Sequence, residues 1–249
     1  MFKNERQHQI YKILSERTFA SVCELGELLY TSESSIRRDL AQMENEGLVK
    51  REWGGACAVG GAESVLPFRA RSYRAVDEKR AIAQKAITLI KEGDVVFLDQ
   101  SSTSYFLALS LMNYSNLTVV SNNIEILSLL SHTNITVHST GGVISRKNRN
   151  CLIGNNAQRT FTEIYADHAF FSANALSADG VITDCTEEEI FVRCAMLNNA
   201  AQKIFLCDGS KIDKLSVYKQ CSIAEVDIAI SDNDGLLKYK DMFPSLTVL

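Results

Sequence analysis

The stretch of residues 32–40, Ser-Glu-Ser-Ser-Ile-Arg-Arg-Asp-Leu, constrains the fold of this chain more than any other. Ile36, Leu40 and then Met43 recur at helical spacing, which predicts a helix with one buried face. Ser32 suits the N-cap position, because its hydroxyl can accept a hydrogen bond from a first-turn N–H. This stretch by itself fits a solvated surface helix as well as a helix whose hydroxyls and arginines contact the bases and phosphates of DNA.

The neighbouring sequence favours a DNA-binding helix-turn-helix. Residues 5–16 predict a first helix, and Ser21 with Glu24 matches a capping box at the start of a short second helix. Gly47 suits the residue just after the end of the third helix. Residues 48–56 then predict two strands joined by a tight glycine turn, which together form a β-wing. Short helices, a short turn and a wing make a specific combination.

The same residues carry a family resemblance. The motif Ser-x-x-Ser-Ile-Arg-Arg-Asp-Leu, then Gly-Leu-Val-x-Arg and Trp-Gly-Gly-Ala, is similar to the N-terminal domain of the DeoR family of bacterial transcriptional regulators. The family usually has Thr at the position of Ser35, and often His or Tyr near Trp53, so the hydroxyl and the aromatic character are kept. The resemblance implies that the third helix and the wing contact a double-stranded DNA operator, whereas the basic wing residues without the glycine turn would indicate only a solvated strand edge. The residues expected at this interface are Ser32, Ser34, Ser35, Arg37, Arg38, Lys50 and Arg51.

Composition limits the class of protein. The 249 residues are enough for two domains, and the formal net charge of −4 still allows a local basic face to bind phosphate. Seven cysteines without a CxxC pair argue against a disulfide framework or a zinc ribbon and fit a reducing cytoplasm. The four histidines are isolated, so we expect neither a metal nor a cofactor. No apolar run is long enough to span a bilayer, and the first residues lack the apolar core of a signal peptide, so we expect a cytoplasmic protein without a membrane partner.

The composition changes at residues 58–76, which we interpret as a linker between a DNA-binding domain at 1–57 and a second domain at 77–249. The first part of this linker is small and glycine-rich. The second part is basic with interleaved aromatics. We expect Phe68 and Tyr73 to pack on the second domain, while the arginines either contact phosphate or stay solvated.

Residues 77–249 alternate between helix and strand patterns. Apolar runs such as 95–98 and 204–206 are separated by amphipathic helices. Uninterrupted apolar strands of this kind predict a largely parallel sheet that helices cover on both faces. The expected fold class is therefore α/β, with an N-terminal winged helix-turn-helix followed by a largely parallel α/β domain.

Polar and glycine residues follow the expected strands, at the edge where parallel sheets bind ligands. The first cluster also opens a helix, whose unpaired N–H groups suit a phosphate. Each cluster alone is ordinary turn chemistry, but four of them at equivalent positions favour a shared cleft. This half of the chain resembles the C-terminal sensor domain of the same family, which is related in fold to ribose-5-phosphate isomerase. The resemblance adds an Asp-Gly pair to the site and implies a phosphorylated sugar or related metabolite as effector.

One departure from the family pattern stands at the first cluster. Ser101 occupies the place where the family has glycine, so its side chain either obstructs a phosphate or contributes another hydroxyl. The residues expected at the effector site are Asp99, Ser101, Ser102, Thr103, Ser121, Asn122, Asn123, Gly141, Gly142, Asp179, Gly180, Asp208, Ser210 and Lys211.

Both halves together predict a repressor of a carbohydrate-utilisation operon whose DNA binding the effector controls. A helix-turn-helix reads one half-site, so we expect a homo-oligomer, a dimer or tetramer, assembled through the C-terminal domain. The alternative is a sugar-phosphate isomerase-like enzyme with an appended DNA-binding domain, for which Asp99, Asp179 and Asp208 are candidate bases. No compact run of acids with a lysine accompanies them, so we expect no enzyme. A protein-interaction role for the winged helix is a third hypothesis, which the paired arginines disfavour.

Overall fold

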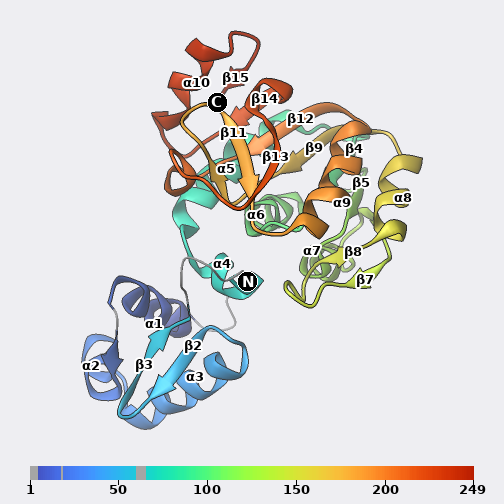
Figure 1. Ribbon diagram of the computed structural model, residues 1–249. Coiled ribbons are helices and arrows are strands. Elements are labelled where there is room, and N and C mark those ends of the chain that lie inside the picture. Colours follow the sequence, from blue (N-terminus) through green and yellow to red (C-terminus); the bar gives the residue numbers. More distant parts are fainter. Residues whose placement is uncertain (1–4, 18, 60–65) are drawn as a thin grey trace. The chain divides into compact units, whose positions relative to one another are not determined.

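The computed structural model describes residues 5–17, 19–59 and 66–249, and the chain divides into two compact units, Met1–Arg74 and Ala75–Leu249 (Figure 1). The glycines at the centre of the expected linker and the first four residues lie outside the described residues. Each unit is described by itself.

The first unit is a winged helix-turn-helix, as predicted. Its sheet is antiparallel in the order β1-β3-β2, with the wing formed by β2 and β3. Its core contains Ile10, Leu25, Ile36, Leu40 and Met43, which all three principal helices contribute. The elements are α1 (Glu5–Glu16), β1 (Ala20–Ser21), α2 (Val22–Leu28), α3 (Glu33–Asn45), β2 (Val49–Glu52), β3 (Gly55–Ala58) and α4 (Phe68–Tyr73).

The basic-aromatic segment of the expected linker is helical and packs within this first unit. Ala70 and Tyr73, three residues apart and therefore on one face of α4, join the core of the first unit. The Tyr73 ring stacks on His8, with centroids 5.8 Å apart, and lies 5.5 Å from the ring of Tyr11. The prediction that Tyr73 packs on the second domain is therefore wrong. Phe68 is buried beneath the Arg71 guanidinium, which lies 5.8 Å from its ring centroid.

The second unit is built on a seven-stranded sheet in the order β15-β14-β12-β9-β4-β5-β6. Every neighbouring pair in it is parallel, as predicted. The inner strands β4 and β14 are apolar and buried because helices cover both faces, whereas the edge strand β6 is largely exposed. The strands are β4 (Val95–Leu98), β5 (Thr118–Ser121), β6 (Thr136–Ser139), β9 (Ala166–Phe171), β12 (Ala200–Leu206), β14 (Ile228–Ile230) and β15 (Thr247–Val248).

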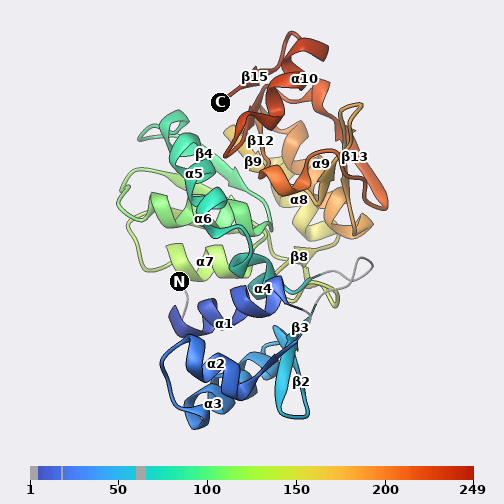
Figure 2. The ribbon, with the colours of Figure 1, turned by 90° about the vertical axis from the view of Figure 1, so that its left-hand side faces the viewer.

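Helices α5, α6 and α7 lie on one face of this sheet, and α8 and α9 lie on the other (Figure 2). The face under α8 and α9 holds an aromatic core, which includes Phe97, Phe161, Phe171 and Phe205. The helical segments are α5 (Val76–Ala86), η1 (Ile87–Leu89), α6 (Ser102–Leu111), α7 (Ile124–Leu130), α8 (Asn155–Glu163), α9 (Glu187–Asn198), η2 (Gly209–Lys211), η3 (Ile223–Glu225), η4 (Asp234–Leu236) and α10 (Leu237–Met242).

Two small antiparallel sheets, which the sequence did not lead us to expect, complete the second unit. One has the order β10-β11-β13 and the other is the β7–β8 hairpin. Within the described residues no helix is both long and apolar enough to cross a membrane. The strands are β7 (Val143–Ile144), β8 (Leu152–Ile153), β10 (Ala175–Leu176), β11 (Val181–Asp184) and β13 (Tyr218–Ser222).

Candidate DNA interface and effector site

The N-terminal end of α3 presents a cluster of hydroxyls. Ser32 is the N-cap, and its Oγ accepts the Ser35 N–H at 3.4 Å. The Ser32 Oγ also lies 3.0 Å from the hydroxyls of both Ser34 and Ser35. Ser32 and Ser34 are exposed and Ser35 is half-buried. These hydroxyls can reach a partner at the helix end without unfolding the cap.

The basic side chains beside them are exposed, and most pair with nearby acids. Arg38 is exposed one residue after Arg37, and the wing strand β2 carries the other two cations. Exposed pairs such as these contribute little stability and exchange partners readily. The ion pairs are Arg37–Glu33 at 2.6 Å, Lys50–Glu52 at 3.6 Å and Arg51–Glu44 at 3.9 Å.

A partly buried ion pair, which the sequence reading missed, holds α3 against α1. Asp39 is buried, and its Oδ2 accepts from Arg6 Nε at 2.5 Å. One turn further along α3, Gln42 Oε1 accepts from Gln7 Nε2 at 3.1 Å. Both contacts fix the rotation of α3, and with it the direction in which its outer face points.

The wing tip depends on two glycines with different roles. Gly54 has a φ of +81°, which a side chain would strain. At Gly55 a Cβ would lie 2.2 Å from the Ala20 carbonyl oxygen, so β1 and β3 could not approach as they do. Trp53, just before them, is fully exposed. The turn thus projects an indole ring from the end of the wing.

The effector-site candidates of the second unit lie at the carboxyl edge of the parallel sheet. The strand order turns back at β4, because β5 and β6 lie on one side of it and β9 and β12 on the other. Ligands of open α/β sheets bind at such a switch point. Asp99 follows β4, Asn122 follows β5, Ser172 follows β9 and Asp208 follows β12, so the four side chains share this edge.

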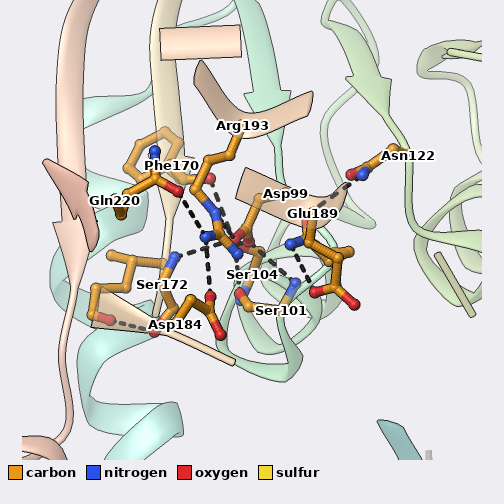
Figure 3. Close-up of polar contacts among 12 residues, drawn as sticks. Asp99, Ser101, Ser104, Asn122, Phe170, Ser172, Asp184, Glu189, Arg193 and Gln220 are labelled. Atoms are coloured by element: carbon orange, nitrogen blue, oxygen red, sulfur yellow. Dashed lines mark hydrogen bonds and ion pairs between the residues drawn. The ribbon is translucent and has the colours of Figure 1, made fainter. Parts of the chain in front are cut away.

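Asp99 accepts hydrogen bonds on both of its oxygens (Figure 3). Its Oδ1 accepts the Ser101 N–H at 3.1 Å and the Ser104 hydroxyl at 2.6 Å, and its Oδ2 accepts the Ser172 N–H at 3.2 Å. Ser101 is the N-cap of α6, since its Oγ accepts the Ser104 N–H at 3.0 Å. Ser101, which stands where the family has glycine, is therefore a buried helix cap.

Arg193 of α9 completes this cluster, and the sequence reading did not find it. Only 2% of its side chain is exposed. Its Nε lies 3.2 Å from Asp99 Oδ2, and its Nη1 lies 2.9 Å from Asp184 Oδ2 and 3.0 Å from Gln220 Oε1. Burial alone would lower the pKa of the guanidinium, but Asp184 and Asp99 outweigh it and raise the pKa. Arg193 thus stays charged and ties the β4 end to β11 and β13, as Figure 3 shows.

A second polar layer adjoins this ion-pair cluster. Glu189, one helical turn before Arg193, accepts from Gln100 Nε2 at 2.9 Å and from Asn148 Nδ2 at 3.1 Å. Asn122 Nδ2 donates to Gln100 Oε1 at 3.3 Å. Within the described part of the chain, four buried polar atoms around this layer have no hydrogen-bond partner. They are Thr103 Oγ1, Asn122 Oδ1, Asn148 Oδ1 and Thr186 Oγ1.

Lys211 and Asp208 form the opposite side of the edge. Lys211 Nζ donates to Ser172 Oγ at 2.6 Å and lies 3.3 Å from Asp208 Oδ2. Asp208 also accepts the Ser210 hydroxyl and, at 3.2 Å, the Ser210 N–H. Burial would raise the pKa of Asp208, but Lys211 and Ser210 outweigh it and lower the pKa to about 2.

Other expected effector residues have structural duties. Asn123 caps α7, since its Oδ1 accepts the Glu125 N–H at 3.0 Å, and Ser121 Oγ donates to the Leu98 carbonyl at 2.8 Å. Gly141 is exposed, with a φ of +63°. A Cβ on Gly142 would lie 2.4 Å from the Ile153 carbonyl oxygen. Ser102 is buried at the start of α6 beside Thr103.

The structure does not bring Asp179 and Gly180 to this edge. They form the β10–β11 turn, where Ser177 donates its hydroxyl to Asp179 and a Cβ on Gly180 would lie 2.6 Å from the Phe243 ring. Asp184, which contacts Arg193, stands at the other end of β11. The Asp-Gly pair therefore serves the turn.

A winged helix-turn-helix joined to an α/β unit with a buried polar site defines a class of protein, the transcriptional regulators that carry a sensor domain. Residues 6–60 match the DeoR-like helix-turn-helix domain, and residues 74–233 match the DeoR C terminal sensor domain. The chain belongs to the DeoR family of transcriptional regulators.

Relatives match over nearly their whole length. The HTH-type transcriptional regulator GolR of Listeria innocua is 32% identical over 94% of this chain and 92% of its own. The L-fucose operon activator of Haemophilus influenzae is 31% identical over 99% and 100%. The lactose phosphotransferase system repressor of Staphylococcus epidermidis is 29% identical over 96% and 95%. Among solved structures, ribose 5-phosphate isomerase A of Methanocaldococcus jannaschii aligns with 56% of each chain at 20% identity and a TM-score of 0.43.

Proposed function

We propose that this regulator binds an operator through α3 and the wing, represses a carbohydrate-utilisation operon, and responds to a phosphorylated sugar held by its second unit. The observation that carries the proposal is the hydroxyl and arginine cluster at the exposed end of α3, on a domain whose family regulates transcription. The carbohydrate assignment is supported by relatives named for lactose and L-fucose systems. One of these two relatives is named a repressor and the other an activator, so their names do not decide between repression and activation.

The start of α6 supports a phosphate as part of the effector. Ser102 and Thr103 occupy the first helical positions, whose N–H groups have no acceptor inside the helix. Thr103 Oγ1 is buried beside them with no hydrogen-bond partner among the described residues. N–H groups, a hydroxyl and the positive end of a helix together suit a phosphate. Ser101 leaves these groups available because its own hydroxyl caps Ser104.

The same geometry argues against an isomerase. An enediol mechanism needs a carboxylate that can take a proton from the substrate. Asp99 already accepts from four donors, one of them Arg193. Asp208, with its pKa lowered to about 2, is a poor base. Asp179 stands in the β10–β11 turn. We therefore propose that the chain has no catalytic activity.

We also propose that the protein acts in the cytoplasm as a homo-oligomer, a dimer or tetramer held together by the second unit. A helix-turn-helix reads one half-site, so two copies match a symmetric operator. Sedimentation of the full chain with and without DNA measures the assembly.

Operator binding is tested with the DNA that lies upstream of the gene for this chain, against an unrelated fragment of equal length. Arg37→Ala and Arg38→Ala should each weaken binding by about 1–3 kcal/mol if the arginine contacts a base. Arg159→Ala is the matched control, because Arg159 pairs with Glu163 at 2.6 Å in the same i,i+4 geometry as Arg37 with Glu33, but on α8. Equal affinity for both fragments, or equal loss in all three variants, would refute the DNA interface.

A further inference from the structure

The start of α9 has the Ser/Thr-x-x-Glu pattern of a capping box but does not form one, unlike two other helices of this chain. Ser21 with Glu24 and Ser222 with Glu225 both close a capping box, in which each side chain bonds the other residue's backbone N–H. Thr186, three residues before Glu189, has the same sequence pattern but makes no side-chain cap bond. A cap of this type stabilises a helix by about 1 kcal/mol. Leaving it open indicates that Glu189 and Thr186 serve the interior instead.

Glu189 is the end point of a one-way chain of hydrogen bonds. Asn122 donates to Gln100, Gln100 donates to Glu189, and Asn148 donates to the other oxygen of Glu189. A carboxylate only accepts, so Glu189 fixes the orientation of the Gln100 and Asn148 amides. The Asn122 amide is held as well by the Leu152 carbonyl, which accepts from its Nδ2 at 3.2 Å. The N–H₂ groups of Gln100 and Asn148 donate to Glu189 and that of Asn122 donates to Gln100 and Leu152, which leaves the oxygens of Asn122 and Asn148 at the two ends of the chain.

These two amide oxygens are buried and have no partner in the described ranges. Buried polar atoms of this kind normally find a partner. An amide oxygen can be satisfied only by a donor, such as a hydroxyl. A ligand group that only accepts, such as a carboxylate or a keto oxygen, would leave both oxygens unsatisfied and would also meet the charge of Glu189.

We propose that Asn122, oriented by the Leu152 carbonyl and Gln100, and Asn148, oriented by Glu189, form a subsite that selects the hydroxyl groups of the effector and rejects carboxylate or keto groups at that position. The inference rests on the proposed sugar-phosphate effector, whose phosphate occupies the start of α6. Gln100 joins the two places, since it directly precedes the Ser101 cap and bonds both Asn122 and Glu189. The ligand class is thus a phosphorylated polyhydroxylated chain, and Glu189 is a positioning residue.

Asn148 belongs to the loop between β7 and β8. Asn148 is the contact of this loop with Glu189, at 3.1 Å. The loop is closed on itself by the Ser145 N–H to the Cys151 carbonyl at 2.8 Å and the Cys151 N–H to the Asn148 carbonyl at 2.9 Å. The loop is also held to the start of α7, because the Ile124 N–H donates to the Asn150 carbonyl at 3.0 Å, so the position of Asn148 is fixed.

The test measures ligand binding by the full chain, with thermal shift and calorimetry as the two methods. The probes are inorganic phosphate and a panel of pentose and hexose phosphates, each with its deoxy and aldonic acid counterparts. The wild-type protein should bind one sugar phosphate more tightly than phosphate. It should disfavour the deoxy counterpart by about fivefold for each hydroxyl lost, the usual value of one neutral hydrogen bond.

Glu189→Gln is the diagnostic variant, because glutamine has the same shape but can donate, so the amides of Gln100 and Asn148 lose their fixed orientation. Its preference for the hydroxylated ligand over the aldonic acid should fall to within about twofold, while its affinity for inorganic phosphate stays unchanged. Glu188→Gln removes an exposed charge one residue earlier and should retain both the preference for the hydroxylated ligand and the affinity for phosphate. Asn148→Ala provides a second variant with the same expected loss of selectivity, on a loop whose change leaves the Asp99–Arg193 pair intact.

Different outcomes overturn different claims. If phosphate, sugar phosphates and deoxy compounds bind alike, or if both variants keep the wild-type selectivity, the hydroxyl subsite is refuted while the phosphate site stands. If no sugar phosphate binds at all, the proposed effector class fails, and this subsite fails with it.

Discussion

Removing the Arg193 guanidinium should destabilise the second unit strongly, and the loss should depend on pH. The change is Arg193→Met, which keeps much of the side-chain length but no charge. Asp99 would keep the Ser101 and Ser172 N–H groups as donors. Asp184 would keep chiefly the Cys185 N–H, which donates to it at 2.7 Å, so Asp184 would bear most of the loss.

The magnitude follows from burial. With 2% of the Arg193 side chain exposed, and 1% and 9% of the Asp99 and Asp184 side chains, solvent does little to screen the carboxylates left behind. Breaking a buried ion pair from one side costs about 3–5 kcal/mol. For a unit of this size that corresponds to a fall of about 6–20 °C in its melting temperature.

Calorimetry of the full chain between pH 4 and pH 7 measures both effects. A buried carboxylate without a counter-charge favours its protonated form, so the gap between Arg193→Met and wild type should narrow as the pH falls. Adding Asp184→Asn to Arg193→Met should recover about half of the loss at pH 7. Arg159→Met on α8, which breaks only an exposed pair, should cost less than about 1 kcal/mol.

A loss below about 1 kcal/mol for Arg193→Met, or a gap that does not change with pH, would refute this account. The first result would mean that the two carboxylates find other partners. The second would mean that the destabilisation comes from lost packing around the methionine.

Two further predictions concern Asp208 and Trp53. The folded-state pKa of Asp208, about 2, lies below the unfolded value of about 3.9, so Asp208 contributes about 2 kcal/mol above pH 4 that is lost as the pH falls toward 2. Urea unfolding across this range should therefore show a steeper loss in wild type than in Asp208→Asn, and parallel curves would contradict the assignment. Trp53 is the only tryptophan and is fully exposed, so its emission should be that of a solvated indole in the native protein. Operator DNA should quench or shift this emission and unrelated DNA should do so less; no change with operator would remove the wing tip from the interface.

The sequence predicted most of the architecture because the signals for it are local. The helical spacing of Ile36, Leu40 and Met43 specified α3, and all three are buried in the core of the first unit. The apolar run that became β4 specified a strand of a parallel sheet in the same way. The capping box at Ser21 and Glu24 formed as its pattern predicted.

The parts that sequence reasoning missed depend on contacts between distant residues. Arg193 and Asp99 are 94 positions apart, and nothing near either residue indicates the other. The available signal was on α9 itself, where Glu189 and Arg193 stand four residues apart on a face otherwise formed by apolar residues such as Val192 and Met196. Tyr73 was assigned to the wrong unit because its position in an aromatic segment does not reveal which core the helix faces.

If α3 and the wing bind DNA as proposed, the ion pairs around α3 make that binding an exchange of partners. Arg37 would have to leave Glu33, and Arg51 would have to leave Glu44, before either could meet a phosphate. Each carboxylate already neutralises its arginine and so displaces some of the ions that a bare cationic surface would attract. The salt dependence of operator binding should therefore be shallower than a count of phosphate contacts gives. Nonspecific DNA offers phosphates but few base contacts and would compensate poorly for the lost ion pairs, so on this proposal the acids beside the arginines favour the correct site.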